Sequence, residues 1–116
     1  MQNKKLGNLG EEIAVNYLKE QGLKILETNF YCRQGEIDII AKEKDEIVFV
    51  EVKTRTSKTF GNPVDAITSV KKLHIYKTAR YYLYKYHLKN VGIRFDVVEV
   101  LLEEGNFKVN HIKQIL

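Results

Sequence analysis

Two short segments of the chain carry acidic and basic side chains at a spacing that could support hydrolysis of a phosphodiester bond. Asp38 lies within the apolar run 37–41, and Glu51 is followed two residues later by Lys53 at the end of the run 47–52. Two carboxylates can bind a hard cation such as Mg²⁺, which keeps other coordination positions for water and phosphate. A neighbouring ammonium group could orient the attacking water and stabilise the charge of the transition state.

The two segments are expected to form a β-hairpin that brings these groups together. A two-residue turn at 44–45, or a four-residue turn at 43–46, places Asp38 opposite Glu51 and Glu36 opposite Lys53. Because side chains alternate along a strand, the four charged groups share one face. The apolar residues of the hairpin form the other face: Ile37, Ile39, Val48, Val50 and Val52.

Opposed carboxylates repel each other, so something must offset the cost of placing Asp38 and Glu51 together. A bound divalent cation would do so. The alternative is a surface network in which Lys53 and a neighbouring arginine neutralise the two acids without any metal. The residues of the hairpin alone leave both interpretations open.

The rest of the chain predicts the elements that must position this hairpin. Apolar residues recur at helical spacing over 5–21, where Gly22 supplies a stop, and over 66–87. In the second helix one stripe is formed by Val70, Leu73, Tyr76 and Leu83, with Ile75, Ala79, Tyr82 and Tyr86 beside it. Strands are expected at 23–28, 36–41, 47–53, 93–102 and 107–112, with a polar turn region at 29–35, a loop at 54–62 and a turn at 104–106. The order αβββαββ predicts a mixed α/β sheet flanked by helices, in a single domain over 1–116.

The positive charge of the chain is concentrated in one segment. The net charge is +4, yet residues 53–94 contain ten Lys and Arg and a single acid, Asp65. Such a segment is either the solvated face of a long helix or a surface that binds phosphates. The candidate contacts to nucleic acid are Arg55, Lys58, Lys71 and Lys72, and Tyr81 and Tyr84 are the tyrosines that could stack on bases.

Several other kinds of site and location are excluded or disfavoured. Cys32 is the single cysteine, so no internal disulfide can form and a reducing, cytoplasmic location is expected. It has no partner base that would make it a nucleophile, and the three histidines are too far apart in sequence to suggest a metal site. No apolar run is long enough to span a membrane. Monomer and homodimer both remain open.

Blocks of residues along almost the whole chain resemble a known family. Asp38 followed by Glu51-Val52-Lys53 is similar to the PD-(D/E)xK nuclease signature, with Ile37 in place of the usual proline. The blocks at 10–14, 35–40, 48–55 and 94–98 resemble the YraN family of small bacterial proteins. That family is similar to archaeal Holliday junction resolvases. The resemblance implies a restriction-endonuclease-like fold.

The resemblance also implies roles for individual residues. Asp38 and Glu51 would hold Mg²⁺ or Mn²⁺, Lys53 would be the catalytic lysine, and Glu11 would complete the site, for which Glu12 is less suited. The implied function is metal-dependent endonuclease cleavage of nucleic acid, with DNA favoured over RNA and branched DNA as one candidate substrate. The alternative is a non-catalytic nucleic-acid-binding or scaffold protein that keeps the nuclease fold.

Overall fold

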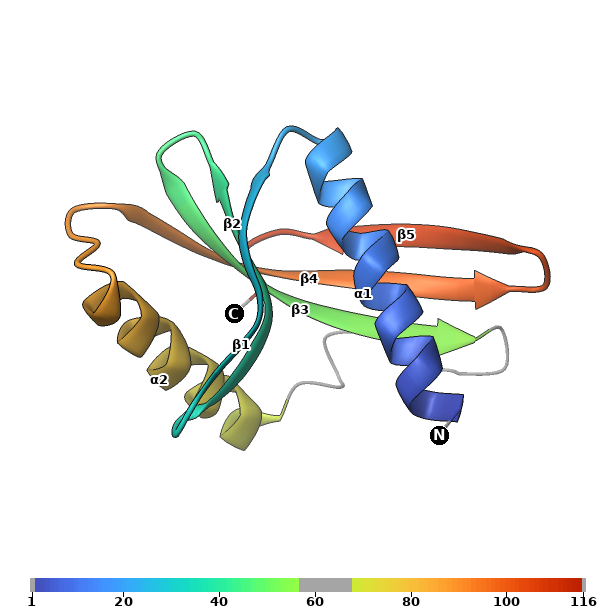
Figure 1. Ribbon diagram of the computed structural model, residues 1–116, viewed down its shortest axis with the longest axis horizontal. Helices are drawn as coiled ribbons and strands as arrows, with labels where there is room; N and C mark the ends of the chain where they lie inside the picture. The colour runs from blue at the N-terminus through green and yellow to red at the C-terminus, as the bar shows by residue number, and fades with distance from the viewer. Residues whose placement is uncertain (1, 57–67, 116) are drawn as a thin grey trace.

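The computed structural model describes residues 2–56 and 68–115, with side chains from residue 7 onward. Seven elements follow one another along the chain (Figure 1): α1 (Gln2–Glu20), β1 (Lys24–Cys32), β2 (Gly35–Glu43), β3 (Glu46–Thr56), α2 (Ser69–Lys85), β4 (Gly92–Glu103) and β5 (Asn106–Ile112). The predicted order αβββαββ is confirmed. None of the helices in the described part of the chain is long and apolar enough to cross a membrane.

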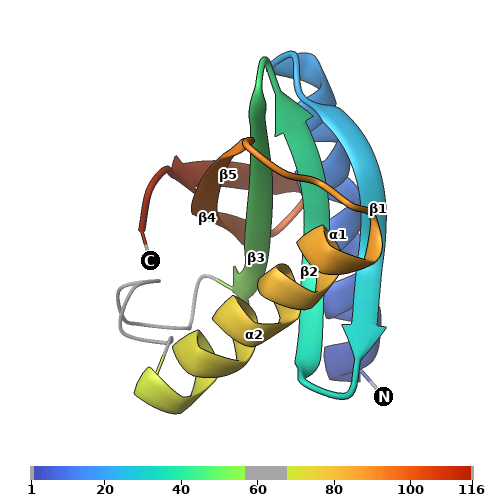
Figure 2. The same cartoon turned by 90° about the vertical axis from the view of Figure 1, so that its left-hand side faces the viewer.

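The strands form one five-stranded sheet in the order β1-β2-β3-β4-β5. β3 and β4 run parallel, and the other neighbouring strands run antiparallel. A parallel pair needs a crossover connection, which α2 supplies. The two helices lie on opposite faces of the sheet (Figure 2). This mixed sheet between two helices is consistent with the restriction-endonuclease-like fold.

The sheet buries a separate apolar cluster on each face. On the α1 side, Ala14 and Leu18 of the helix pack against strand residues that include Ile39, Val50 and Val98. On the α2 side, the buried residues are Phe30, Ile37, Ile40, Ile47, Phe49, Ala79 and Tyr82. Because both faces are covered, the central strands are apolar on both sides, which explains why β3 is the clearest strand in the sequence.

The predicted boundary of the first strand was wrong. β1 continues through Cys32, so the polar turn region expected at 29–35 shrinks to a two-residue turn at Arg33 and Gln34. Phe30 pairs with Ile37 of β2 and is 3% exposed, and its burial offsets the poor strand propensity of its polar neighbours. Within this strand Asn29 has a positive φ of 51°, which asparagine tolerates better than most residues.

The predicted apolar stripe of α2 was wrong at Val70 and Leu73, whereas Ile75, Ala79 and Tyr82, predicted beside it, are buried. Val70 and Leu73 are 66% and 51% exposed, whereas the buried side chains are Ile75, Thr78, Ala79 and Tyr82. The Tyr82 ring packs edge-to-face on Phe30 and Phe49 of the sheet, with centroids 5.1 and 6.0 Å apart. Small side chains at Thr78 and Ala79 let the helix approach closely, so packing against these rings, rather than apolar periodicity alone, decides which face is buried.

A buried ionic network ties β4 to the C-terminal segment. Asp96 is fully buried, and Arg94 donates to both of its carboxylate oxygens. His111 Nε2 lies 2.7 Å from Asp96 Oδ2, and the Gln114 N–H donates to Oδ1. Burial by itself raises the pKa of Asp96, but the hydrogen bonds from His111 and Arg94 outweigh it and hold this pKa below its usual value.

We expect Asp96→Ala to destabilise the fold by about 3–5 kcal/mol, because it leaves the Arg94 guanidinium buried without its main partner. Urea unfolding monitored by circular dichroism measures the loss. Glu46→Ala is the matched control, since Glu46 also contacts Arg94, at 3.3 Å, but its side chain is 39% exposed. Equal losses in the two variants would contradict a structural role specific to the buried pair.

Candidate active site

Glu11 reaches the sheet because α1 crosses β3 at unusually close range. A Cβ atom added at Gly10 would collide with the side chain of Thr54, so only glycine permits this approach. The next residue, Glu11, is half-buried, and its Oε1 atom is buried with no hydrogen-bond partner among the described residues. Glu12 is exposed. Glu11 therefore presents a carboxylate oxygen without a hydrogen-bond partner among the described residues.

Asp38 lies where β2 and β3 separate. The predicted register is confirmed along the paired part of the hairpin, where Ile40 pairs with Phe49, but the ladder ends at Ile39 and Val50. Beyond that point Asp38 Oδ2 accepts a hydrogen bond from the Val52 N–H at 2.8 Å. A carboxylate side chain thus takes the place of a backbone partner at the end of the ladder.

The separation of the strands corrects two predictions about the hairpin faces. Ile37 was expected on the face of Ile39, but Ile37 packs in the α2 cluster and Ile39 in the α1 cluster. Glu36 was expected opposite Lys53, but it is exposed and pairs with Tyr31 of β1. The simple two-residue alternation fails here because regular alternation holds only while the strands remain paired.

Two lysines flank Glu51. This glutamate is 9% exposed, and its Oε1 lies 2.8 Å from Lys71 Nζ and 3.8 Å from Lys53 Nζ. Lys53 comes from the same strand, as predicted, whereas Lys71 comes from the first turn of α2, which Thr68 caps by accepting a hydrogen bond from the Lys71 N–H. Lys71 was predicted only as a phosphate contact, and its place beside Glu51 could not be read from sequence spacing.

The carboxylates of the site disfavour one another's charge. Burial, followed by the charge of Glu51, raises the pKa of Asp38 from 3.8 to about 7, and Glu11 adds to this effect. Burial also raises the pKa of Glu11, with further contributions from Glu36 and Glu51. Three acids from α1, β2 and β3 are therefore close enough to repel, and the hydrogen bond from Val52 and the charge of Lys71 offset this only in part.

The pKa of Lys53, the lysine of the predicted signature, is lowered rather than raised. Burial lowers the pKa of Lys53, and the neighbouring ammonium group of Lys71 lowers it further. A lysine with a lowered pKa gives up its proton more readily than an exposed one, so Lys53 could exchange a proton with a bound water as well as stabilise negative charge.

Two of these three acids, Glu11 and Asp38, border an open cavity of about 290 Å³ between α1 and the β1–β2 hairpin. Glu11, Glu12 and Asp38 line it together with Asn8, Val15, Thr28, Asn29 and Ile39. Within residues 2–56 and 68–115, no three His, Cys, Asp or Glu side chains are arranged as a ready-made metal site. The sequence-predicted ligands thus come together as neighbours rather than as a preassembled coordination shell.

The predicted nucleic-acid contacts have different positions. Arg55 lies two residues beyond Lys53 and forms an ion pair with Glu99, with Nε and Oε2 2.7 Å apart. Lys72 is half-buried on α2. Lys58 lies outside the described residues. The alternative of a surface network without metal fits Glu51, although its partners are two lysines and not a lysine and an arginine. It does not fit Asp38, which has no ion pair in the described part of the chain.

Comparison with known proteins places the chain in a family. Residues 10–100 match the model described as "Uncharacterised protein family UPF0102". The chain belongs to this family. It is 51% identical over 112 residues to a UPF0102 protein of Clostridioides difficile, covering 97% of this chain and 96% of the relative. A UPF0102 protein of Clostridium acetobutylicum is 54% identical over 104 residues, covering 90% and 85% of the two chains.

A third UPF0102 relative, from Caldicellulosiruptor saccharolyticus, is 50% identical over 115 residues, covering 97% of this chain and 98% of the relative. The resemblance to the YraN family is confirmed by these matches to UPF0102. The matched range 10–100 includes Glu11, Asp38, Glu51, Lys53 and Lys71, so the whole candidate site lies within the family's common region.

The raised pKa of Asp38 predicts an unusual pH dependence of stability without divalent ions. Between 3.8 and about 7 the folded chain retains a proton on Asp38 that the unfolded chain loses, so stability falls as pH rises through this range. We expect Asp38→Asn, assayed in EDTA, to raise the melting temperature on the order of 5 °C at pH 8 and by much less at pH 5. Differential scanning calorimetry measures both values.

Asp45→Asn is the matched control for this experiment, because Asp45 is exposed in the β2–β3 turn. Its effect should be small and should not change between the two pH values. A destabilising effect of Asp38→Asn at pH 8 would show that the hydrogen bond to Val52 outweighs charge repulsion, contrary to our expectation.

Proposed function

We propose that this protein is a metal-dependent nuclease that binds nucleic acid and hydrolyses phosphodiester bonds. The observation that carries the proposal is the meeting of Glu11, Asp38 and Glu51, each from a different element, beside a lysine whose pKa is lowered. Raised carboxyl pKa values such as those of Asp38 and Glu11 reduce the stability of a fold at neutral pH, and groups arranged in this way are typical of functional sites. The resemblance to Holliday junction resolvases makes branched DNA the first substrate to test.

The chemistry of the donor set fits Mg²⁺ or Mn²⁺. Both ions prefer oxygen ligands, and Asp38, Glu51 and Glu11 supply only carboxylate oxygens. The buried Oε1 of Glu11, which lacks a hydrogen-bond partner in the described residues, is an unused ligand atom. When bound, the ion would supply positive charge that polarises the phosphoryl group. It would also remove the repulsion that raises the pKa of Asp38.

The residues of the chain divide the remaining tasks. Lys53 would orient the attacking water and stabilise the charge that develops on the phosphoryl oxygens. Lys71 holds the Glu51 carboxylate in place through the same oxygen that Lys53 approaches, with Lys71 Nζ 2.8 Å from Oε1. Val52 fixes Asp38 through its backbone N–H. These supports let the acids keep one orientation before the substrate binds, which lowers the cost of organising the site.

The second candidate function is nucleic-acid binding without cleavage. Its supporting observation is that Glu51 is already neutralised by two lysines, an arrangement that can be stable without metal. α2 carries five Lys and Arg and no acid, so it suits a phosphate backbone under either proposal. The two functions differ in whether loss of Lys53 affects chemistry or only affinity.

Divalent ions should stabilise the protein if the acids form a metal site. We expect Mg²⁺ or Mn²⁺ at about tenfold above its Kd to stabilise the fold by about 1.4 kcal/mol, seen as a rise in Tm. Glu11→Gln should reduce this gain. Glu20→Gln, which removes the same charge from an exposed residue at the other end of α1, should leave it unchanged. An equal gain in both variants, or none in the wild type, would count against Glu11 as a ligand.

The last test separates catalysis from binding. We expect Lys53→Ala to lower cleavage at saturating nucleic acid about a hundredfold or more, with Kd changed only slightly, because a preorganised charge acts mainly on the transition state. Lys72→Ala removes an equal charge from α2 and should affect Kd rather than the rate. A panel of duplex, flap, junction and single-stranded DNA and RNA provides the substrates. A wild type that cleaves none of them with either metal would favour the binding-only function.

A further inference from the structure

The outward face of α2 is an unusual mixture of aromatic and basic side chains. Lys77, Arg80, Tyr81 and Tyr84 follow one another at helical spacing on the side opposite the buried residues Ile75, Ala79 and Tyr82. Tyr84 is 77% exposed, and no aromatic ring among the described residues stacks on it. Neither tyrosine belongs to the candidate active site.

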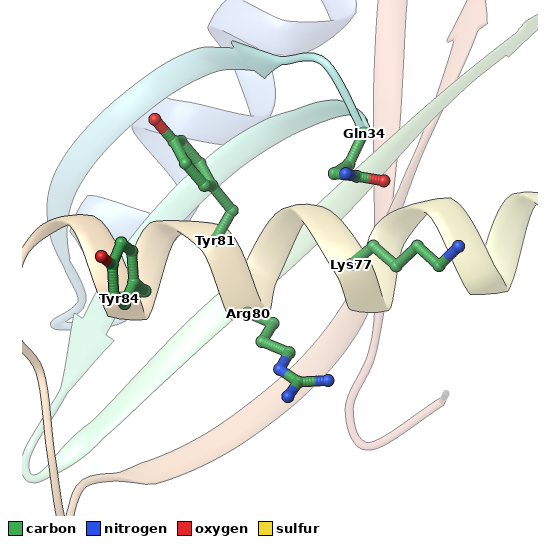
Figure 3. Close-up of a pocket in the computed structure, with 5 residues that line it drawn as sticks. All are labelled: Gln34, Lys77, Arg80, Tyr81 and Tyr84. Atoms are coloured by element: carbon green, nitrogen blue, oxygen red, sulfur yellow. The ribbon is translucent and has the colours of Figure 1, made fainter.

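The tip of the β1–β2 hairpin turns this face into a groove. His74 Nδ1 lies 2.9 Å from the backbone oxygen of Gln34, and Gly35 permits the close contact, since a Cβ there would press on Thr78 and His74. The resulting hollow of about 370 Å³ is lined by Gln34, Lys77, Arg80, Tyr81 and Tyr84 (Figure 3). A second hollow of about 380 Å³ shares Gln34 and Tyr81 with it and adds Tyr31, Cys32, Arg33 and Lys85. We call the two together the hairpin groove.

Tyr81 is held in a fixed position within the groove. One side of its ring lies over Phe30, with centroids 6.3 Å apart and planes inclined by 29°, and the residue is still 42% exposed. A ring supported from behind loses little side-chain entropy when a second flat group stacks on it. In Figure 3 the rings of Tyr81 and Tyr84 lie toward one end of the hollow, and Lys77 and Gln34 toward the other.

The chemistry of the groove indicates the kind of partner. Its charged residues are all cations, Lys77, Arg80, Lys85 and Arg33, and no residue lining either hollow is acidic. Cations beside exposed aromatic faces fit a polyanion that also offers flat groups, which describes unpaired nucleotides. Bases within a duplex are stacked on one another and cannot offer their faces to tyrosine.

We propose that the hairpin groove binds a single-stranded segment of nucleic acid, with bases on Tyr81 and Tyr84 and phosphates on Lys77 and Arg80. Lys71, beside Glu51, precedes Lys77 by six residues and so lies about 9 Å away along the helix axis. The strand in the groove would therefore start within about two helical turns of the candidate active site. This inference rests on the proposed function. It implies a substrate that has a single-stranded arm next to the phosphodiester bond that is cleaved.

Binding of fluorescein-labelled oligothymidylate, measured by anisotropy in EDTA, tests the groove without any cleavage. We expect Tyr84→Ala to weaken binding about tenfold, the scale of one lost base–aromatic stack, and Tyr84→Phe to retain it. Phe107→Ala is the matched control, because Phe107 is a 51% exposed aromatic on β5 that lines neither hollow of the groove. Lys77→Ala should reduce the slope of log K against log salt by about one.

The single cysteine gives an independent measure of location. Cys32 is a free thiol that lines the second hollow, so bound oligothymidylate should slow its alkylation by a maleimide. Protection in the wild type and its loss in Tyr84→Ala would support the proposal. Binding that leaves the alkylation rate unchanged would overturn it, because the strand would then lie elsewhere.

The experiments distinguish failure of the groove proposal from failure of the proposed nuclease function. Oligothymidylate binding that depends on Tyr84, without cleavage of any substrate, would keep the groove and remove the nuclease. Cleavage of duplex DNA with equal affinities for Tyr84→Ala and Phe107→Ala would keep the nuclease and overturn the groove. A wild type that binds no oligonucleotide at low salt would overturn the groove as well, and would indicate a protein partner for this face.

Discussion

The hydrogen bond from the Val52 N–H to Asp38 is the contact on which the candidate site depends. It forms where β2 and β3 separate, and it satisfies a backbone donor that the ended ladder would leave without a partner. The same bond holds a carboxylate in a partly buried position next to Glu51, where burial and repulsion raise its pKa to about 7. The Val52 N–H thus gains a hydrogen-bond partner, but the partner is a carboxylate whose charge is disfavoured by burial and by Glu51.

Where β2 and β3 separate, side chains from both faces of the sheet come close to Asp38. α1 covers one face and brings Glu11, and α2 covers the other and brings Lys71, yet both charges act on Asp38. Two packing features bring the helix residues to this point: the contact of Gly10 with Thr54 and the insertion of Tyr82 between the rings of Phe30 and Phe49. The site is therefore assembled by core packing on both sides of the sheet.

Asp96 and Asp38 are both at least partly buried, but they differ in how well their carboxylates are satisfied. Asp96 has hydrogen-bond partners in Arg94, His111 and Gln114, and its pKa is lowered. Asp38 has one backbone hydrogen bond and two acidic neighbours, and its pKa is raised. Complete pairing is what a structural network requires, whereas incomplete pairing leaves atoms available for a ligand.

The order of elements and the family could be predicted from the sequence. The register of the β2–β3 hairpin could be predicted as well, because the turn residues Lys44 and Asp45 and the apolar runs on either side of them act locally. Other features depended on contacts between distant segments. Packing against Phe30 and Phe49 decided which face of α2 is buried, and the separation of β2 and β3 moved Ile37 to the α2 side. The sequence by itself determined the order of the elements and pointed to Asp38, Glu51, Lys53 and Glu11 as the candidate site residues, which stay a prediction. Only the tertiary structure decided that Lys71 lies beside Glu51 and that Tyr81 and Tyr84 border a groove, because helix orientation is set by side-chain packing across the sheet and not by local spacing.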